Sequence, residues 1–415
     1  MKQDRHLVPV QPQLFNAFAC PKCGAEAPRP LDVLFIGLQV VGQYECAHCG
    51  LAFSRDLPIG FAIDHPLAYT TKDREILDPS GKAEKWIHYE VYKQPSKEPI
   101  KLERKVYREA KDIVIVNTLD FLYGHVLLKL LNAQYYIDHH KDLGVVLLLP
   151  RMFEWLVPDG VAEVWLVDQK LSQARAWHDK VDAFVREQLP RYNEVYMARG
   201  YGHPDLAHVD IERFTKVKPF PANEFLTRPP HITFIARQDR LWFATPLGHF
   251  MYRVWNRLGL RKSLGRWFVA AQSRMIKRAM RRIRKELPQA TFTVVGLAPA
   301  GGFEGLAEDL RTERMDVAAE RRWCEAYAKS QLVVGVHGSN MLLPTGHAAG
   351  CVEILPYDRY CNMVQDVLVR YNDRMQLFFY RFVDEYAAPA DVARHVTTMF
   401  RYFHQYRQNK QVNAF

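Results

Sequence analysis

Four cysteines near the N-terminus are the residues whose types and spacing predict chemistry most directly. They form two pairs, Cys20 with Cys23 in CPKCG and Cys46 with Cys49 in CAHCG, and a glycine follows each pair. Each turn of this kind presents two thiolates, so two turns facing one another provide a tetrahedral four-sulfur site. We therefore predict that these cysteines bind one structural Zn²⁺ ion. Because four sulfurs complete its coordination, the ion would stabilise folding and take no part in catalysis.

Two short strands must position these cysteine turns. The predicted strands span residues 33–36 and 40–44, on either side of Gly37, and together with the turns they are typical of a zinc ribbon occupying residues 1–60. Few basic or aromatic residues lie between the cysteine pairs, so we do not expect the ribbon to contact nucleic acid. We expect it to order the N-terminus against the rest of the chain or against a partner.

The length and charge of the chain limit the classes of protein to which it can belong. Its 415 residues exceed what one hydrophobic core usually fills, which predicts two or three domains. The formal net charge of +10 favours anionic partners: nucleic acid, an acidic membrane surface or a sugar nucleotide. No apolar run is long enough for a signal sequence or a spanning helix, and the cysteines outside the two pairs are scattered. These features predict a cytoplasmic protein, with peripheral contact with an anionic membrane as a further expectation.

Beyond the ribbon, apolar runs alternate with helical patterns. Continuous apolar strands are predicted at 112–117, 144–149, 164–167, 231–236, 292–295, 332–336 and 352–355, with helices between them. This alternation predicts parallel sheets covered on both faces, and hence an α/β fold with two Rossmann-like domains facing a cleft. The predicted domains are the ribbon at 1–60, a connector with one or two helices at 61–110, Rossmann-like domains at 111–225 and 226–388, and a C-terminal helix at 389–415.

Three loops follow predicted strands at the ends where parallel sheets bind ligands. They span residues 118–125 in the first Rossmann-like domain, and residues 237–240 and 337–340 in the second. We expect the residues that carry out chemistry to lie in these loops.

The segment LVVGVHGSNMLLPTGHAAGCVEILP, residues 332–356, contains the strongest candidate for an anion site. A buried strand leads to His337 and Gly338, and Ser339 and Asn340 can cap the helix that follows, whose first N–H groups suit a phosphate. The segment resembles the HG motif of glycosyltransferases with the GT-B fold, in particular those of glycosyltransferase family 61. The resemblance includes the downstream V-E-I-x-P element that contains Glu353.

This resemblance implies that His337, Gly338, Ser339 and Asn340 contact the diphosphate of a nucleotide-sugar donor. It also implies that Glu353 belongs to the donor-binding region of the second Rossmann-like domain. Two alternatives stay open from the residues alone. His337 can be a core histidine with local hydrogen bonds, and Glu353 can orient a backbone turn.

The run FIARQDR, residues 234–240, is similar to the strand-then-arginine segment of the same enzymes. The resemblance implies that a basic side chain here neutralises the leaving diphosphate, and the planar guanidinium of arginine can bind phosphate oxygens in pairs. Arg237 is the first candidate for this role and Arg240 is the second. The alternative is a surface ion pair with Asp239.

The run LYGHVLLKLLNAQY, residues 122–135, is similar to the family's aromatic-x-H segment, whose histidine begins a helix on the acceptor side. Inverting sugar transfer needs a base near the acceptor hydroxyl, and His125 and Asp120 are the candidates. The family's acidic residue after this motif is replaced around Lys129, so the acceptor class stays open. The position of this segment in the first Rossmann-like domain, together with the resemblance, implies that this domain binds the acceptor.

The resemblance covers roughly residues 112–385 and leaves the ribbon outside it. It implies an inverting glycosyltransferase that moves a sugar from a nucleotide-sugar donor to a glycan or glycolipid acceptor, as in polysaccharide biosynthesis. No D-x-D signature occurs at a position where a cation would bridge the diphosphate, so we predict catalysis without a catalytic metal.

Three other segments allow rival interpretations. The helix at 274–288 places apolar residues on one stripe among many arginines, which predicts a solvated basic face or, alternatively, electrostatic docking to anionic lipid. The run IDHHKD, residues 137–142, resembles a metal phosphoesterase motif, but its position between a helix and a strand disfavours metal binding. The stretch 294–305 lacks GxGxxG spacing, which disfavours a dinucleotide cofactor. A non-enzymatic zinc-ribbon protein that binds nucleic acid on an α/β scaffold is the alternative to a transferase.

Overall fold

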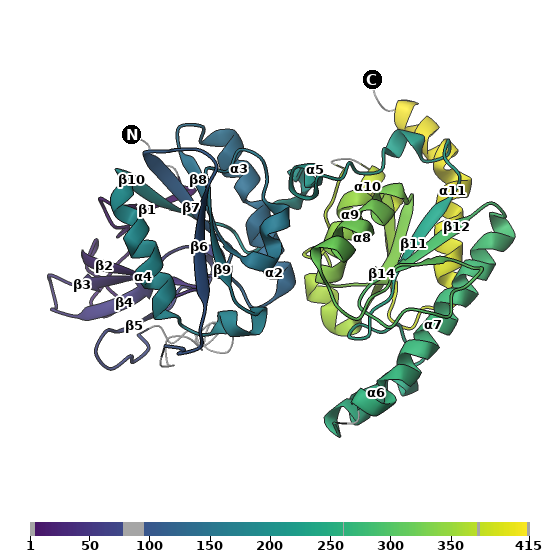
Figure 1. The fold of residues 1–415 in the computed structure, drawn as a ribbon, viewed down its shortest axis with the longest axis horizontal. Coiled ribbons are helices and arrows are strands. Elements are labelled where there is room, and N and C mark those ends of the chain that lie inside the picture. Colours follow the sequence, from purple (N-terminus) through teal and green to yellow (C-terminus); the bar gives the residue numbers. More distant parts are fainter. Residues whose placement is uncertain (1–4, 78–94, 260, 372–373, 413–415) are drawn as a thin grey trace. The chain divides into compact units, whose positions relative to one another are not determined.

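The computed structural model of the protein describes residues 5–77, 95–259, 261–371 and 374–412. The chain forms two compact units, Met1–Pro204 and Asp205–Phe415 (Figure 1). The finer domain limits that the sequence predicts stay predictions. Among the described residues, no helix is both long and apolar enough to cross a membrane.

The main sheet of the first unit has six strands in the order β1-β10-β7-β8-β9-β6. The four central strands are parallel, and the two edge strands run antiparallel to their neighbours. This confirms the predicted parallel α/β organisation, although the sequence did not indicate β1, β6 or β10. The strands are β1 (Leu7–Gln11), β6 (Lys101–Val106), β7 (Asp112–Asn117), β8 (Gly144–Pro150), β9 (Glu163–Asp168) and β10 (Glu194–Ala198).

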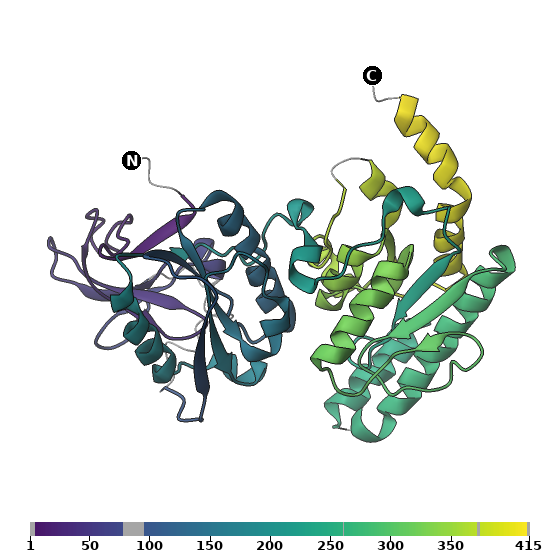
Figure 2. The same cartoon turned by 45° about the horizontal axis from the view of Figure 1, so that its top comes forward.

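Helices cover both faces of this sheet, with α4 on one side and α2 and α3 on the other (Figures 1 and 2). Their bounds are α2 (Tyr123–Leu131), α3 (Ala133–His139) and α4 (Asp179–Gln188). Asn132 separates α2 from α3. The amide of Asn132 donates hydrogen bonds to the carbonyl of Leu128, 3.0 Å away, and to that of Tyr201, 2.9 Å away, which anchors this break.

The ribbon contains a second sheet, which has four antiparallel strands in the order β2-β3-β4-β5. They are β2 (Arg29–Phe35), β3 (Val40–Glu45), β4 (Ala52–Asp56) and β5 (Ala68–Thr70). The sequence predicted only the two strands around Gly37, so the sheet is larger than expected and extends past residue 60.

The ribbon sheet and the main sheet of the first unit share one hydrophobic core. Phe35 and Val40 of the ribbon belong to the same buried cluster as Ile113 and Ile115 of β7. Polar contacts reinforce this packing, because Arg186 of α4 binds Asp32 of β2 through two hydrogen bonds of 3.0 Å. The ribbon is therefore an integral part of the first unit.

Two predictions about the region between the ribbon and α4 need correction or qualification. In the predicted connector 61–110, the described residues form strands β5 and β6 and a single short 3-10 helix, Gly60–Ile63, while residues 78–94 lie outside the described part.

The IDHHKD run lies at the end of α3, and buried His140 stacks on Tyr136 with ring centroids 5.6 Å apart. Within the described ranges, only the four ribbon cysteines form a cluster able to hold a metal ion.

The sheet of the second unit has six strands, all parallel, in the order β13-β12-β11-β14-β15-β16. This is the strand order of a doubly wound Rossmann sheet, in which the chain direction across the sheet reverses between β11 and β14. The strands are β11 (His231–Ile235), β12 (Thr291–Val295), β13 (Glu308–Asp309), β14 (Leu332–Val336), β15 (Gly350–Leu355) and β16 (Tyr380–Asp384).

Helices α7 and α11 cover one face of this sheet, and α8 and α9 cover the other (Figures 1 and 2). The helices of the unit are α5 (Ile211–Thr215), α6 (Pro246–Arg257), α7 (Arg261–Glu286), α8 (Val317–Lys329), α9 (Leu342–His347), α10 (Met375–Phe379) and α11 (Pro389–Val412). The apolar stripe predicted at 274–288 lies on α7 and is core, since Ile276, Met280 and Ile283 are all buried against the sheet. The arginines between them face outward.

Truncation of Met280 tests whether the α7 stripe supports the fold. Met280 is fully buried, so Met280→Ala would leave a cavity and lower the free energy of unfolding by about 2–5 kcal/mol. The neighbouring Arg281→Gln changes an exposed side chain and is expected to shift it by less than about 0.5 kcal/mol. Urea denaturation of both variants measures the difference. Equal effects would contradict the assignment of the stripe to the core.

Candidate active site and metal centre

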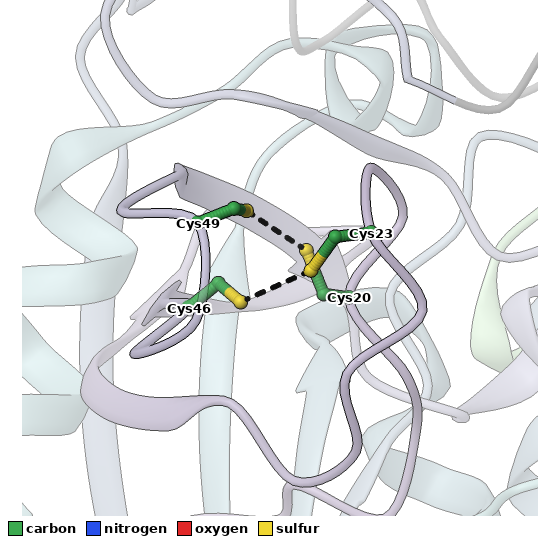
Figure 3. Close-up of side chains that lie close together, drawn as sticks. All are labelled: Cys20, Cys23, Cys46 and Cys49. Atoms are coloured by element: carbon green, nitrogen blue, oxygen red, sulfur yellow. Dashed lines mark hydrogen bonds between the residues drawn. The ribbon is translucent and has the colours of Figure 1, made fainter.

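The four cysteines of the ribbon meet at one point between two matched turns. Figure 3 shows their sulfurs pointing toward one another, and all four lie within 4.8 Å of each other. The Sγ atoms of Cys20 and Cys49 are 3.8 Å apart and those of Cys23 and Cys46 are 3.5 Å apart. Four sulfurs around a zinc ion with bonds of about 2.3 Å would be separated by about 3.8 Å. The cluster therefore fits a metal ion such as zinc.

The backbone of each cysteine turn explains the glycine that follows the second cysteine. Gly24 and Gly50 have φ angles of 73° and 68°, a left-handed conformation that glycine adopts without strain. Each donates its N–H to the carbonyl of the first cysteine of its turn, at 2.9 Å in one turn and 2.8 Å in the other. Hydrogen bonds from the backbone N–H groups of Cys49 and His48 lower the pKa of the Cys46 thiol to about 6, which favours the thiolate that a metal requires.

Replacement of one ribbon cysteine tests the metal centre. We expect the purified protein to contain about one zinc ion per chain, and Cys46→Ser to lose most of it because a serine hydroxyl replaces a thiolate poorly. Metal analysis by mass spectrometry measures this. Cys361→Ser, which changes an exposed cysteine far from the cluster in sequence, is the matched control. Equal zinc contents in the two variants would contradict the site.

The carboxyl ends of β11 and β14 define the candidate site of the second unit. Ligands of open α/β sheets bind where the strand order reverses, and these two adjacent strands mark that point. Arg237 and Arg240 follow β11, and the turn from His337 to Asn340 follows β14. The structure thus brings the two predicted donor-binding segments to the same end of the sheet.

Arg240 lies directly against the backbone of Gly338. A Cβ atom at Gly338 would be only 2.4 Å from the guanidinium carbon of Arg240, and the φ angle of this glycine is 145°. The guanidinium also donates a hydrogen bond of 3.2 Å to the carbonyl of His337. Burial, together with the nearby guanidinium of Arg359, lowers the pKa of Arg240. The carboxylates of Asp239 and Asp366 offset this effect only in part, so a bound anion would further stabilise the charged guanidinium.

Arg237 has a different environment, in which Asp239 occupies its guanidinium. The two side chains form two hydrogen bonds of 2.7 Å, which is the ion pair that the sequence left open as an alternative. Burial raises the pKa of Asp239, but the pairing with Arg237 outweighs it and holds that pKa below its usual range. Of the two arginines, Arg240 is therefore the one that contacts the turn after β14.

His337 and Glu353 form a fully buried pair beneath this turn. Nδ1 of His337 is 2.6 Å from Oε2 of Glu353, and Nε2 donates to the carbonyl of Asn362 at 3.1 Å. Burial opposes a charge on the imidazole, but the carboxylate outweighs it and raises the pKa of His337. Burial also raises the pKa of Glu353, although the hydrogen bond with His337 opposes this effect. The side chain of His337 points at Glu353 and not at solvent.

Ser339 and Asn340 begin the short helical segment that follows Gly338. The sequence predicted that they cap a helix, but no side-chain cap forms at this position. The amide of Asn340 instead donates to the carbonyl of Val336 at 3.1 Å and so closes the turn on the end of β14. The two half-buried residues lie beside the segment that Arg240 contacts.

Asp120 and His125 follow β7 at the carboxyl end of the first sheet, as predicted. Asp120 is buried, and its Oδ2 accepts a hydrogen bond of 2.8 Å from the Lys129 ammonium. Its Oδ1 lies 3.4 Å from Nδ1 of His125. Burial raises the pKa of Asp120, but Lys129 and His125 together outweigh burial and lower it to about 2. Asp120 is therefore an ionised group that pairs with its neighbours at neutral pH.

Asp56 and Gln39 are polar residues of this region that the sequence did not indicate. Both are buried and line a cavity of about 30 Å³ together with Asn117, Asp120 and His125. Oδ2 of Asp56 accepts a hydrogen bond from Gln39 at 3.2 Å and one from the Leu67 backbone at 3.1 Å, while Oδ1 of Asp56 and Oε1 of Gln39 have no partner. Burial raises the pKa of Asp56 to about 7. The ribbon thus contributes a titratable carboxyl group to the end of β7.

The raised pKa of Asp56 predicts a pH-dependent stability. The unfolded chain releases this proton near pH 4, whereas the folded protein keeps it until about pH 7, so stability falls as pH rises through this window. Asp56→Asn removes this contribution, and its stability relative to the native protein should increase by on the order of 4 kcal/mol between pH 4 and pH 8. Urea denaturation at several pH values measures the change. Asp64→Asn, at an exposed position, is the control, and parallel profiles for Asp56→Asn and the native protein would contradict the prediction.

No protein-family model and no curated protein matches the sequence. Among solved structures, the chain is similar to the ADP-heptose LPS heptosyltransferase II of E. coli, with a TM-score of 0.37 and 8% sequence identity. The similarity covers 71% of this chain and 99% of that one.

Proposed function

We propose that the protein is a glycosyltransferase that moves a sugar from a nucleotide-sugar donor to a glycan or glycolipid acceptor. The observation that carries this proposal is the contact of the Arg240 guanidinium with the Gly338 turn at the reversal point of a Rossmann sheet. This is the place where such sheets bind nucleotides, and the side chain offered there suits a diphosphate. The resemblance of residues 332–356 to the HG motif supports the same assignment.

In this proposal the second unit binds the donor. Arg240 neutralises the diphosphate, and an anion bound beside it would offset the crowding with Arg359. Arg237 would be a second cation once a phosphate oxygen displaces Asp239 from its guanidinium. The backbone of Gly338, Ser339 and Asn340 would line the remaining side of the diphosphate.

His337 and Glu353 are positioning residues in this proposal. Through its two ring nitrogens, His337 ties the end of β14 to Glu353 on β15 and to Asn362 after β15. The pair therefore fixes the backbone on which Arg240 rests, without touching the donor. This replaces the direct diphosphate contact that the resemblance implied for the His337 side chain.

The first unit would bind the acceptor, with His125 as the base. Asp120 is ionised and faces Nδ1 of His125, so it would stabilise the imidazolium that forms when His125 accepts a proton. In the transfer step, His125 takes the proton of the acceptor hydroxyl as its oxygen bonds to the anomeric carbon. The bond from that carbon to the diphosphate breaks, the diphosphate leaves with the electron pair, and the configuration inverts.

Guanidinium groups supply the charge neutralisation that a divalent cation provides in other transferases. The sequence contains no D-x-D pair to hold such a cation. We therefore propose that turnover does not require an added divalent metal and that the ribbon zinc has a structural role.

Ligand binding and turnover test the proposed function. A thermal-shift screen of common sugar nucleotides should raise the unfolding temperature, because a ligand at 100 times its Kd stabilises by about 2.7 kcal/mol. Arg240→Gln should abolish this shift and lower kcat/KM by roughly 100-fold or more. His125→Gln should keep the shift but lower kcat by about 100-fold or more.

Arg322→Gln is the matched control, because it removes an exposed arginine from α8. Its shift and its turnover should equal those of the native protein. The proposal fails if no sugar nucleotide stabilises the native protein, or if Arg240→Gln behaves as the control does.

A further inference from the structure

Helix α6 exposes a continuous stripe of large apolar side chains. Leu247, Phe250, Met251 and Leu258 follow one another at helical spacing and are 66%, 63%, 40% and 65% exposed. The helix has a defined N-terminus: Pro246 lies in its first turn, and the hydroxyl of the N-cap residue Thr245 accepts a hydrogen bond of 3.2 Å from the backbone N–H of Gly248. The stripe therefore belongs to a well-formed helix and is exposed to solvent.

The opposite face of α6 holds the helix on its own unit. The rings of Tyr252 and Trp255 each lie 5.2 Å from Phe268 of α7, and His249 stacks on Phe243 at 4.6 Å. This aromatic contact uses the side of α6 away from the stripe. The exposed apolar residues are thus additional to those that α6 needs for packing.

The segment of the sequence that contains this stripe is basic. Between residues 240 and 285 the sequence contains thirteen Arg or Lys residues and no Asp or Glu. Arg253 and Arg257 follow Phe250 along the same edge of α6, and Arg266 adjoins Trp267, whose side chain is 62% exposed. In Figure 1 this end of the α6–α7 pair extends beyond the sheet of its own unit.

We propose that α6 and the beginning of α7 form a docking surface for an anionic lipid bilayer. A helix with apolar residues on one side and arginines at its border lies in the membrane interface, with the apolar side chains among the acyl chains and the cations at the phosphates. Nucleic acid would use the arginines but not Leu247 or Phe250. The segment 274–288, for which docking was the alternative to a solvated face, is not the docking surface in this proposal, because the apolar stripe of α7 is buried in the core. This proposal does not depend on the proposed function.

Co-sedimentation of the full chain with vesicles tests the docking surface. We expect binding to vesicles of equal parts phosphatidylcholine and phosphatidylglycerol, weaker binding as salt rises, and no binding to phosphatidylcholine alone. Arg253→Gln with Arg257→Gln should weaken binding about tenfold or more, since each arginine near an anionic surface contributes about fivefold. Leu247→Ser with Phe250→Ser should weaken it by at least a similar factor, because two apolar side chains no longer enter the interface.

Matched controls separate docking from charge and from loss of fold. Arg321→Gln with Arg322→Gln removes the same charge from α8, and Leu377→Ser removes an exposed apolar side chain from α10. Both should bind as the native protein does, and all variants should keep its unfolding temperature because the changed residues are exposed. The proposal is overturned if the native protein does not bind the anionic vesicles. It is also overturned if the serine variant binds them as tightly as the native protein, which would indicate a purely electrostatic surface such as one for nucleic acid.

Discussion

A parallel sheet covered by helices on both faces leaves its strand ends as the places where polar chemistry can be accessible. Both units of this protein follow that constraint, since their central strands are continuous apolar runs and the candidate site residues follow β7, β11 and β14. The close approach of Arg240 to Gly338 depends on it directly. Two adjacent strands must end side by side for one to supply the cation and the other the glycine turn.

Buried carboxyl groups show how strongly the local environment decides chemical role in this fold. Asp120 is ionised because Lys129 is 2.8 Å away, whereas Asp56 lacks a cationic hydrogen-bond partner and burial raises its pKa to about 7. Glu353 instead pairs with the imidazole of His337, which lowers its pKa, while burial raises it by more. Three carboxyl groups, all inaccessible to bulk solvent, therefore have three different protonation behaviours. Each follows from which cation or imidazole the fold places next to it.

The sequence indicated the strands that are apolar along their whole length, such as β7, β8 and β14, and the cysteine cluster, whose spacing is local. It did not indicate β6, because KLERKV is an edge strand whose exposed face is charged and therefore reads as a polar connector. It ranked Arg237 above Arg240, because the fact that distinguishes them is the position of Gly338, which is about a hundred residues away in the chain. Asp56 was not predicted for a similar reason, since its burial depends on the packing of one sheet against another.

The shared core of the ribbon and the first Rossmann-like sheet has a consequence for how this chain can be divided or recombined. A zinc ribbon joined by a linker could be exchanged between proteins at its boundary, but here a cut at residue 60 would separate Phe35 and Val40 from Ile113 and Ile115. It would also separate Asp32 from Arg186. A division of the chain that keeps this core intact must therefore leave the ribbon with its sheet and lie near Pro204.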